Sequence, residues 1–95
     1  MKNKYYVVNE KGERILIRTS ANEYKYVLVD IKKINNGEKS CYACSSSYEN
    51  IMKQYNYWTK YYQDWYDACV KNNDIEIGDW YKLQRDNLKI VELVK

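Results

Sequence analysis

The chain of 95 residues contains no histidine and no proline, and only three glycines. Without histidine it can build neither a Ser-His-Asp nor a Cys-His catalytic group, and no imidazole can bind a metal ion. Gly12, Gly37 and Gly78 stand far apart, which excludes a glycine-rich phosphate-binding loop. Asp64 and Asp67 are the closest carboxylates on a predicted helix, and they fall among lysines on its polar side. We therefore predict a protein that is not an enzyme and needs no cofactor or metal ion.

The chain also has no long apolar run, and its number of cysteines is odd. The apolar run near the start covers only residues 5–8, which is too short for a signal peptide or a membrane span. The three cysteines, Cys41, Cys44 and Cys69, are expected to be free thiols in a reducing compartment. These features predict a cytoplasmic protein without membrane contact.

Aromatic residues are abundant, with 12 tyrosines and 3 tryptophans. Disordered chains are poor in such residues, so we expect a folded single domain over residues 1–95. The net charge of +3 is uneven: residues 1–39 carry nine cationic and five acidic side chains (9 − 5 = +4), and residues 40–74 carry three and four (3 − 4 = −1). Only the N-terminal part is basic, which is compatible with contact to a polyanion.

Apolar alternation in the first half of the chain predicts a mostly antiparallel sheet. The predicted strands are residues 4–8, 13–19, 24–34 and 40–44. Gly12 suits the turn of a first hairpin, and Asn36-Gly37 suits a tight turn between the third and fourth strands. Along the third strand Val27, Val29 and Ile31 share one face, which we expect to be buried.

A long amphipathic helix is predicted from about Ser46 to Lys71. Ser46 precedes Glu49 by three residues, which is the spacing of a capping box. Apolar side chains then recur every three or four residues, at Tyr48, Ile51, Met52, Tyr55, Trp58, Tyr62, Trp65, Tyr66 and Cys69. Such a stripe is typical of a helix that packs one face on a core.

The last part of the chain is predicted to be extended. Residues 75–78 suggest a short extended approach, and residues 79–83 and 88–94 suggest a closing hairpin in which Trp80 covers the core or the sheet. The predicted fold is thus α+β, a mostly antiparallel sheet in the order β-β-β-β-α-β-β with one long amphipathic helix packed across it.

Cys41 and Cys44 form a Cys-x-x-Cys motif directly before the predicted helix. Such a pair can be the redox dithiol of a small thiol enzyme or half of a zinc site. A thioredoxin-like unit would need a βαβ context and a proline, and only Cys69, near the far end of the helix, remains as a further thiolate ligand. The pattern favours a packing role for all three cysteines.

Tyr57 and Tyr61 lie off the apolar stripe of the helix, at about 100° per residue, and are expected to be exposed. Large, rigid, amphipathic side chains of this kind are common in protein interfaces. Incidental exposure is the competing interpretation. We predict that Tyr57, Tyr61 and Trp65 bind a protein partner or a second copy of the chain.

The outward face of the N-terminal sheet predicts an alternative surface. Its residues would be Arg14, Arg18, Tyr24, Tyr26 and Lys32. Aromatic rings that stack on bases and cations that contact phosphates are typical of sheets that bind single strands. An ordinary antiparallel sheet with one solvent-exposed face carries the same residue types. Nucleic-acid binding is therefore the alternative hypothesis.

The leading hypothesis is a small non-enzymatic protein-binding module. The chain is small, lacks catalytic groups and is rich in residues with AT-rich codons. In these respects it is similar in character to accessory proteins of phages and other mobile elements. Many of those proteins inhibit host defence enzymes, as anti-CRISPR proteins do. The sharpest form of the hypothesis is thus an inhibitor of a host defence enzyme.

Overall fold

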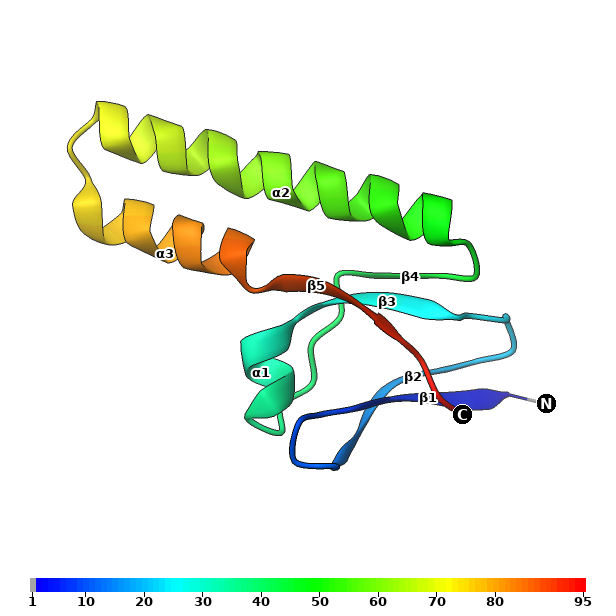
Figure 1. Ribbon diagram of the computed structural model, residues 1–95. Coiled ribbons are helices and arrows are strands. Elements are labelled where there is room, and N and C mark those ends of the chain that lie inside the picture. Colours follow the sequence, from blue (N-terminus) through cyan, green and yellow to red (C-terminus); the bar gives the residue numbers. More distant parts are fainter. Residues whose placement is uncertain (1) are drawn as a thin grey trace.

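The computed structural model describes residues 2–95 and confirms an α+β fold (Figure 1). Its elements are β1 (Asn3–Val8), β2 (Arg14–Ser20), β3 (Tyr26–Asp30), α1 (Ile31–Asn35), β4 (Ala43–Ser45), α2 (Tyr48–Lys71), α3 (Ile75–Asp86) and β5 (Leu88–Glu92). The order is β-β-β-α-β-α-α-β, so two helices replace parts of the chain for which strands are predicted.

The strands form two antiparallel sheets that meet at one backbone bridge. β1 and β2 are the predicted hairpin, and Gly12 takes a positive φ of 79° in its turn. The second sheet has the order β4-β3-β5. Tyr6 and Val94 exchange two backbone hydrogen bonds, of 2.7 and 2.9 Å, and so join the first sheet to the chain just after β5.

The central strand β3 is covered on both faces. Toward β1 and β2 it contributes to the first core, whose buried members are Val7, Ile17, Val27, Val29 and Ile34. Toward α2 it contributes to the second core, whose buried members are Leu28, Ile51, Tyr62 and Leu88. The predicted burial of Val27 and Val29 is confirmed. The opposite face of β3 is not exposed to solvent, because α2 lies across it.

The third predicted strand is shorter than expected because α1 begins within it. The side chain of Asp30 accepts hydrogen bonds from the backbone amides of Lys32 and Lys33, which caps the helix and stops the strand. Gly37 then takes a positive φ of 82° just after α1, so this glycine ends a helix rather than closing a hairpin.

The long helix α2 agrees with the predicted helix apart from its first residues. Ser47, not Ser46, is the N-cap, and its hydroxyl accepts a hydrogen bond from the amide of Asn50. The helix ends at Lys71, and Asn73 takes a positive φ of 57° in the turn that follows. Asparagine tolerates this left-handed conformation better than most residues.

Residues 75–86 form α3, where an extended approach and a strand are predicted. The helix packs antiparallel to α2 along much of its length (Figure 1). Gly78 permits this close approach, since a Cβ built on it would lie 3.2 Å from the Cβ of Cys69. Arg85 also hydrogen-bonds to Gln63 across the helix pair. Packing against α2 therefore overrides the strand preference of the local sequence.

The α2/α3 hairpin extends beyond the sheet, and the molecule is elongated at 51 × 28 × 17 Å (Figure 1). The first half of α2 lies over the sheet, where Ile51 and Tyr55 pack into the second core. The second half contacts α3. Across residues 2–95, no helix combines the length and the apolar composition required to cross a membrane.

Candidate functional site

A row of five aromatic side chains, here called the aromatic ridge, runs along the α2/α3 hairpin. Its members are Tyr57, Tyr61, Trp65, Tyr81 and Trp80. The ring centroids of Tyr57 and Tyr61 are 6.5 Å apart and nearly parallel. Tyr61 is 6.5 Å from Trp65, which stacks on Tyr81 at 5.8 Å. Tyr81 in turn meets Trp80 at 5.1 Å, so the contacts are continuous across both helices.

The ridge is exposed although its base is firmly packed. Tyr57, Trp65 and Trp80 are 61, 47 and 53% exposed, respectively, whereas Tyr81 is half-buried. Beneath them Trp58 and Tyr62 pack into the second core and contact Tyr61 at 5.4 and 5.5 Å. Rings held in this way lose little conformational entropy when they contact a partner.

The spacing of residues explains the position of the ridge. Tyr57, Tyr61 and Trp65 follow one another at four-residue steps, so they line one side of α2 next to the buried stripe. The predicted partner-binding residues are therefore brought together. The sequence pattern does not identify Trp80 and Tyr81 as members of this surface, because it predicts a strand for them. Ile77 stands three residues before Trp80 and four before Tyr81, and this helical spacing is the signal in the sequence that could have found them.

A groove between α2 and α3 continues the ridge toward the loop that joins the two helices. It has a volume of about 310 Å³, and its apolar lining includes Trp65, Ala68, Ile77 and Tyr81. Ile77 is 50% exposed there. The groove could take one apolar side chain of a partner placed beside the ridge.

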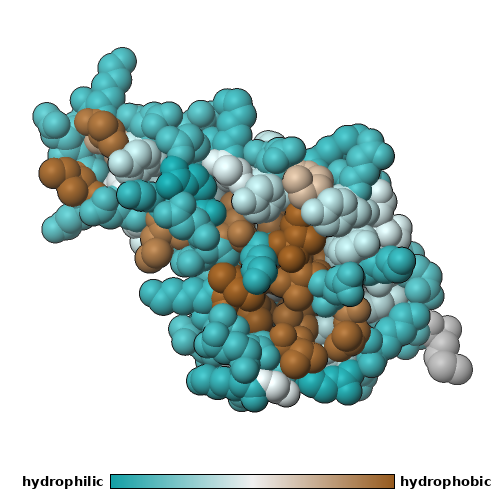
Figure 2. Space-filling model, in the orientation of Figure 1, coloured by the Kyte–Doolittle hydropathy of each residue, from teal (hydrophilic) through white to brown (hydrophobic). Residues whose placement is uncertain are grey.

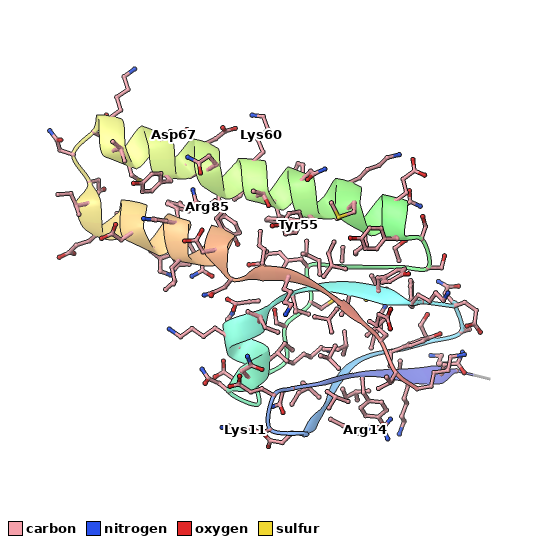
Figure 3. The ribbon with its side chains drawn as sticks, in the orientation of Figure 1. Lys11, Arg14, Tyr55, Lys60, Asp67 and Arg85 are labelled. Atoms are coloured by element: carbon pink, nitrogen blue, oxygen red, sulfur yellow. The ribbon has the colours of Figure 1, made fainter. Side chains whose placement is uncertain are left out.

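The charges around the ridge are predominantly acidic. Residues 57–86 carry four cationic and six acidic side chains (4 − 6 = −2). Lys60 forms an ion pair of 2.7 Å with Asp64, which leaves less free positive charge on α2. Lys60 and Asp67 lie on the side of α2 that faces away from α3, whereas Arg85 lies between the two helices (Figure 3). The field at the ridge therefore disfavours a polyanion.

Three residues of the alternative, nucleic-acid surface lie on or next to the β1/β2 hairpin. The guanidinium of Arg14 lies 4.4 Å from the ring centre of Tyr6, and that of Arg18 lies 5.2 Å from the ring centre of Tyr24. Each of these exposed cations thus covers one face of a tyrosine ring of the same chain. Arg14 also donates a hydrogen bond of 2.8 Å to the carbonyl of Lys95.

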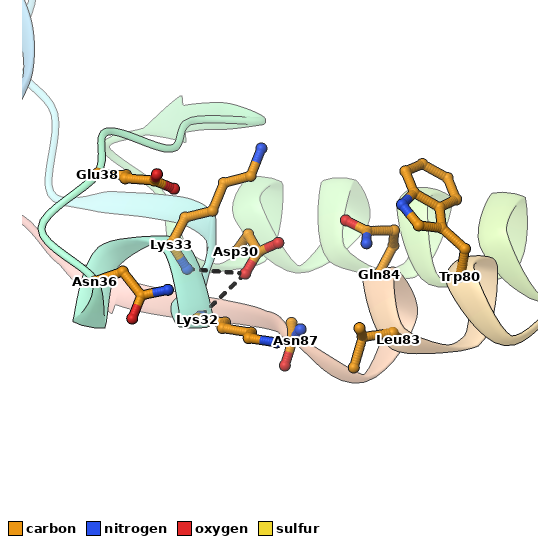
Figure 4. A pocket seen from close by; sticks show the side chains of 9 residues that line it. All are labelled: Asp30, Lys32, Lys33, Asn36, Glu38, Trp80, Leu83, Gln84 and Asn87. Carbon is orange, nitrogen blue, oxygen red and sulfur yellow. Dashed lines mark hydrogen bonds between the residues drawn. The ribbon is translucent and has the colours of Figure 1, made fainter.

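Tyr26 and Lys32 do not share this surface with Arg14. Tyr26 points toward α2, where its ring meets Tyr48 at 5.4 Å and packs on the second core. Lys32 lies on α1 at a polar cavity of about 290 Å³, whose far wall includes Leu83 and Trp80 of α3 (Figure 4). The expectation of one continuous basic and aromatic sheet face is therefore wrong, because α2 occupies one face and α1 interrupts the strand.

Another apolar surface lies between β1 and β5. Figure 2 shows it as a brown patch that runs from the middle of the view toward its lower edge. Val8, Ile31, Ile90 and Val91 contribute to the lining of a shallow cavity of about 470 Å³ at this place. It is wider and flatter than the groove beside the ridge, and charged side chains such as Glu10 and Lys89 line it as well.

No protein-family model, no curated protein and no solved structure matches this chain significantly.

Proposed function

We propose that this protein is a non-enzymatic binding module that uses the aromatic ridge to attach to another protein. The observation that supports it best is the continuous row of aromatic rings along the helix pair, of which Tyr57, Tyr61, Trp65 and Trp80 are exposed. Aromatic anchors of this kind contribute most of the binding energy in many protein interfaces. Tyr57, Tyr61 and Trp65 would be the anchors on α2, and Trp80 and Tyr81 those on α3.

The partner surface would be apolar at its centre and basic at its rim. The rings and the groove of about 310 Å³ need an apolar counterpart. The net charge of −2 over residues 57–86 favours cationic groups around that counterpart. A second copy of the chain is the competing occupant, and its N-terminal part supplies basic residues as well.

In its sharpest form, the proposal is that the module inhibits a larger host defence enzyme in the cytoplasm of a bacterium. A chain of 95 residues can block such an enzyme by covering its substrate-binding surface, and this needs no catalytic group of its own. An inhibitor encoded by a phage or another mobile element would act in this stoichiometric manner, as anti-CRISPR proteins do.

Site-specific photocrosslinking tests the proposal directly. Benzoylphenylalanine replaces Tyr61 in one variant and Tyr48, which is 56% exposed near the start of α2, in a matched control. We expect the variant at position 61 to crosslink one host protein in a bacterial lysate, and the control at position 48 to crosslink it weakly. Excess unlabelled protein should compete, and excess protein with both Tyr57→Ala and Tyr61→Ala should not.

Four outcomes would contradict the proposal. Equal crosslinking at positions 48 and 61, or competition by the double variant, would remove the ridge from the interface. A crosslink only to a second copy, together with a dimer in sedimentation velocity that the double variant abolishes, would replace the proposed partner by self-association. If the captured protein is an enzyme that keeps its full activity at saturation, the inhibitor form of the proposal fails.

Nucleic-acid binding is a second candidate, and the two cation–ring pairs on the β1/β2 hairpin favour it. They would present Arg14, Arg18 and Tyr24 to a phosphate backbone and its bases. Fluorescence anisotropy with labelled single-stranded RNA, single-stranded DNA and duplex at two salt concentrations tests it. Binding that Arg14→Glu with Arg18→Glu abolishes would support this candidate, and flat curves for all three probes would eliminate it.

A further inference from the structure

The thiols of Cys41 and Cys44 are in contact, although the sequence pattern favours a packing role for them. Their Sγ atoms lie 3.6 Å apart. Both are free thiols, Cys41 is exposed and Cys44 is partly exposed. A disulfide requires about 2.05 Å between the sulfur atoms, so the two atoms must approach each other by about 1.5 Å.

The backbone brings the two thiols together by a turn at the start of β4. The amide of Tyr42 donates a hydrogen bond of 2.8 Å to the carbonyl of Leu28, and Cys44 pairs with Val27. Cys44 thus packs on the first core, while Tyr42 packs on the second core at the opposite face of the sheet. Tyr42 and Ala43, which stand between the two cysteines, both pack on the second core. The thiols of Cys41 and Cys44 are thus left to meet each other.

Two cations and the neighbouring thiol activate one sulfur. A hydrogen bond from the Cys44 thiol lowers the pKa of Cys41 to about 7, with help from the charges of Arg18 on β2 and Lys39, and in spite of the opposing effect of partial burial. The same hydrogen bond, followed by burial, raises the pKa of Cys44. Cys41 is thus about half ionised at pH 7, whereas Cys44 keeps its proton.

We propose that Cys41 and Cys44 form a site of reversible thiol–disulfide exchange that reacts with low-molecular-weight disulfides, with Cys41 as the attacking and Cys44 as the resolving thiol. This site lies apart from the aromatic ridge, and the proposal does not depend on the partner of the ridge.

The reaction is balanced in two exchange steps. The Cys41 thiolate attacks one sulfur of the small disulfide, whose S–S bond breaks, and one small thiolate leaves and takes up a proton. Cys44 then loses its proton and attacks the Sγ of Cys41, which releases the second small thiol and closes the Cys41–Cys44 bond. The protein loses two electrons and the small disulfide gains them, which gives two small thiols.

Cys69 provides an internal control. Cys69 is a residue of α2 that is only 8% exposed, and its side chain lies against Gly78 of α3. Burial of this kind keeps a thiol unreactive. The proposal therefore predicts oxidation of two of the three cysteines and no more.

The experiment equilibrates the folded protein at pH 7 with mixtures of reduced and oxidised glutathione. The samples are quenched in acid, alkylated in denaturant and weighed by intact mass spectrometry. We expect a species with one alkylated cysteine, assigned to Cys69 by peptide mapping, which dithiothreitol converts back to three. Cys69→Ser should oxidise as the wild type does. A wild type that keeps three alkylated cysteines at the most oxidising ratio would overturn the proposal.

Single variants test the two roles. Cys44→Ser should accumulate one glutathione adduct at Cys41, and Cys41→Ser should react at least tenfold more slowly. In the Cys44→Ser background, Arg18→Gln should slow adduct formation about two- to fivefold at pH 7 by raising the pKa of Cys41. Arg14→Gln, on the same strand but beside Tyr6, is the matched control and should leave the rate unchanged. Equal rates for Cys41→Ser and Cys44→Ser, or for the two arginine variants, would contradict the assigned roles.

Discussion

The hydroxyl groups of Tyr42 and Tyr62 lie 2.8 Å apart and share a hydrogen bond. The ring of Tyr42 also meets that of Trp58 at 5.0 Å. The segment that leads into β4 is therefore attached to the middle of α2 by both polar and aromatic contacts. Since Trp58 and Tyr62 also support the aromatic ridge, this contact joins the sheet to the base of the candidate binding surface.

The hydrogen bond between Tyr42 and Tyr62 should be measurable by a double-mutant cycle. We expect Tyr42→Phe and Tyr62→Phe each to lower the free energy of unfolding, because each leaves one partly buried hydroxyl without its partner. The double variant should lose less than the sum, with a coupling energy of about 1 kcal/mol. Urea unfolding of the four proteins measures it. Simple additivity would mean that the hydroxyls contribute independently.

Stability should fall in alkaline solution partly because of Tyr42. Burial, then the hydrogen bond with Tyr62, raises the pKa of Tyr42 above its ordinary value of about 10. Above pH 10 the unfolded chain releases this proton more readily than the folded chain, so unfolding is favoured as the pH rises toward the folded pKa. Below pH 10 the contribution is fully present.

Urea midpoints measured between pH 8 and pH 11 test this dependence. Tyr42→Phe should show a smaller alkaline decrease than the wild type, and Tyr57→Phe, on the exposed ridge, serves as the control with an unchanged decrease. Parallel curves for the wild type and Tyr42→Phe would assign the alkaline loss to other groups.

The ridge should contribute to binding and little to stability. Tyr57 is 61% exposed, so we expect Tyr57→Ala to lower the free energy of unfolding by about 0.5 kcal/mol. Ile51, on the same helix, is fully buried, and Ile51→Ala should cost about 2–5 kcal/mol. Thermal and urea unfolding distinguish the two. A loss above about 2 kcal/mol for Tyr57→Ala would show that this ring is a structural residue.

Gly78 should be required for the close contact of α2 and α3. An alanine in a helix gains about 1 kcal/mol over glycine, but its Cβ would lie 3.2 Å from the Cβ of Cys69. That atom is fixed to the backbone of α2, and overpacking costs about 1–3 kcal/mol. We therefore expect Gly78→Ala to lower the free energy of unfolding by about 1 kcal/mol.

The sign of this effect should reverse in a Cys69→Gly background. There the close atom is missing, so Gly78→Ala should raise the free energy of unfolding relative to Cys69→Gly alone. The same loss in both backgrounds would exclude the contact with Cys69 as its cause.

The elements with strong local signals could be predicted from the sequence. The turn at Gly12 fixes the first hairpin, and the stripe from Ile51 to Cys69 fixes the long helix. Residues 75–86 could not be assigned in this way, because Trp80 and Tyr81 also favour strands and their helix depends on contact with α2. The signal of α1 is local, because Asp30 caps it, but it stands in the middle of an apolar alternation that predicts a strand.

The candidate site was predictable to the same degree. The four-residue spacing of Tyr57, Tyr61 and Trp65 placed them together on one helix. The contribution of Trp80 and Tyr81 required the position of a second helix. Alternation predicts an exposed face for Tyr26, because it shows which residues share a face and not whether another element covers that face.

The α2/α3 hairpin reaches past the sheet, and this geometry implies uneven protection of its amide protons from exchange with solvent. At the free end, Val70 and Ile75 are 56 and 73% exposed, and only two helices support each other. That end should open locally at a lower free energy than the strands around Val27, so its amides should exchange first. A partner bound along the ridge would hold the two helices together, and slower exchange in residues 70–80 would then report the binding event without a label.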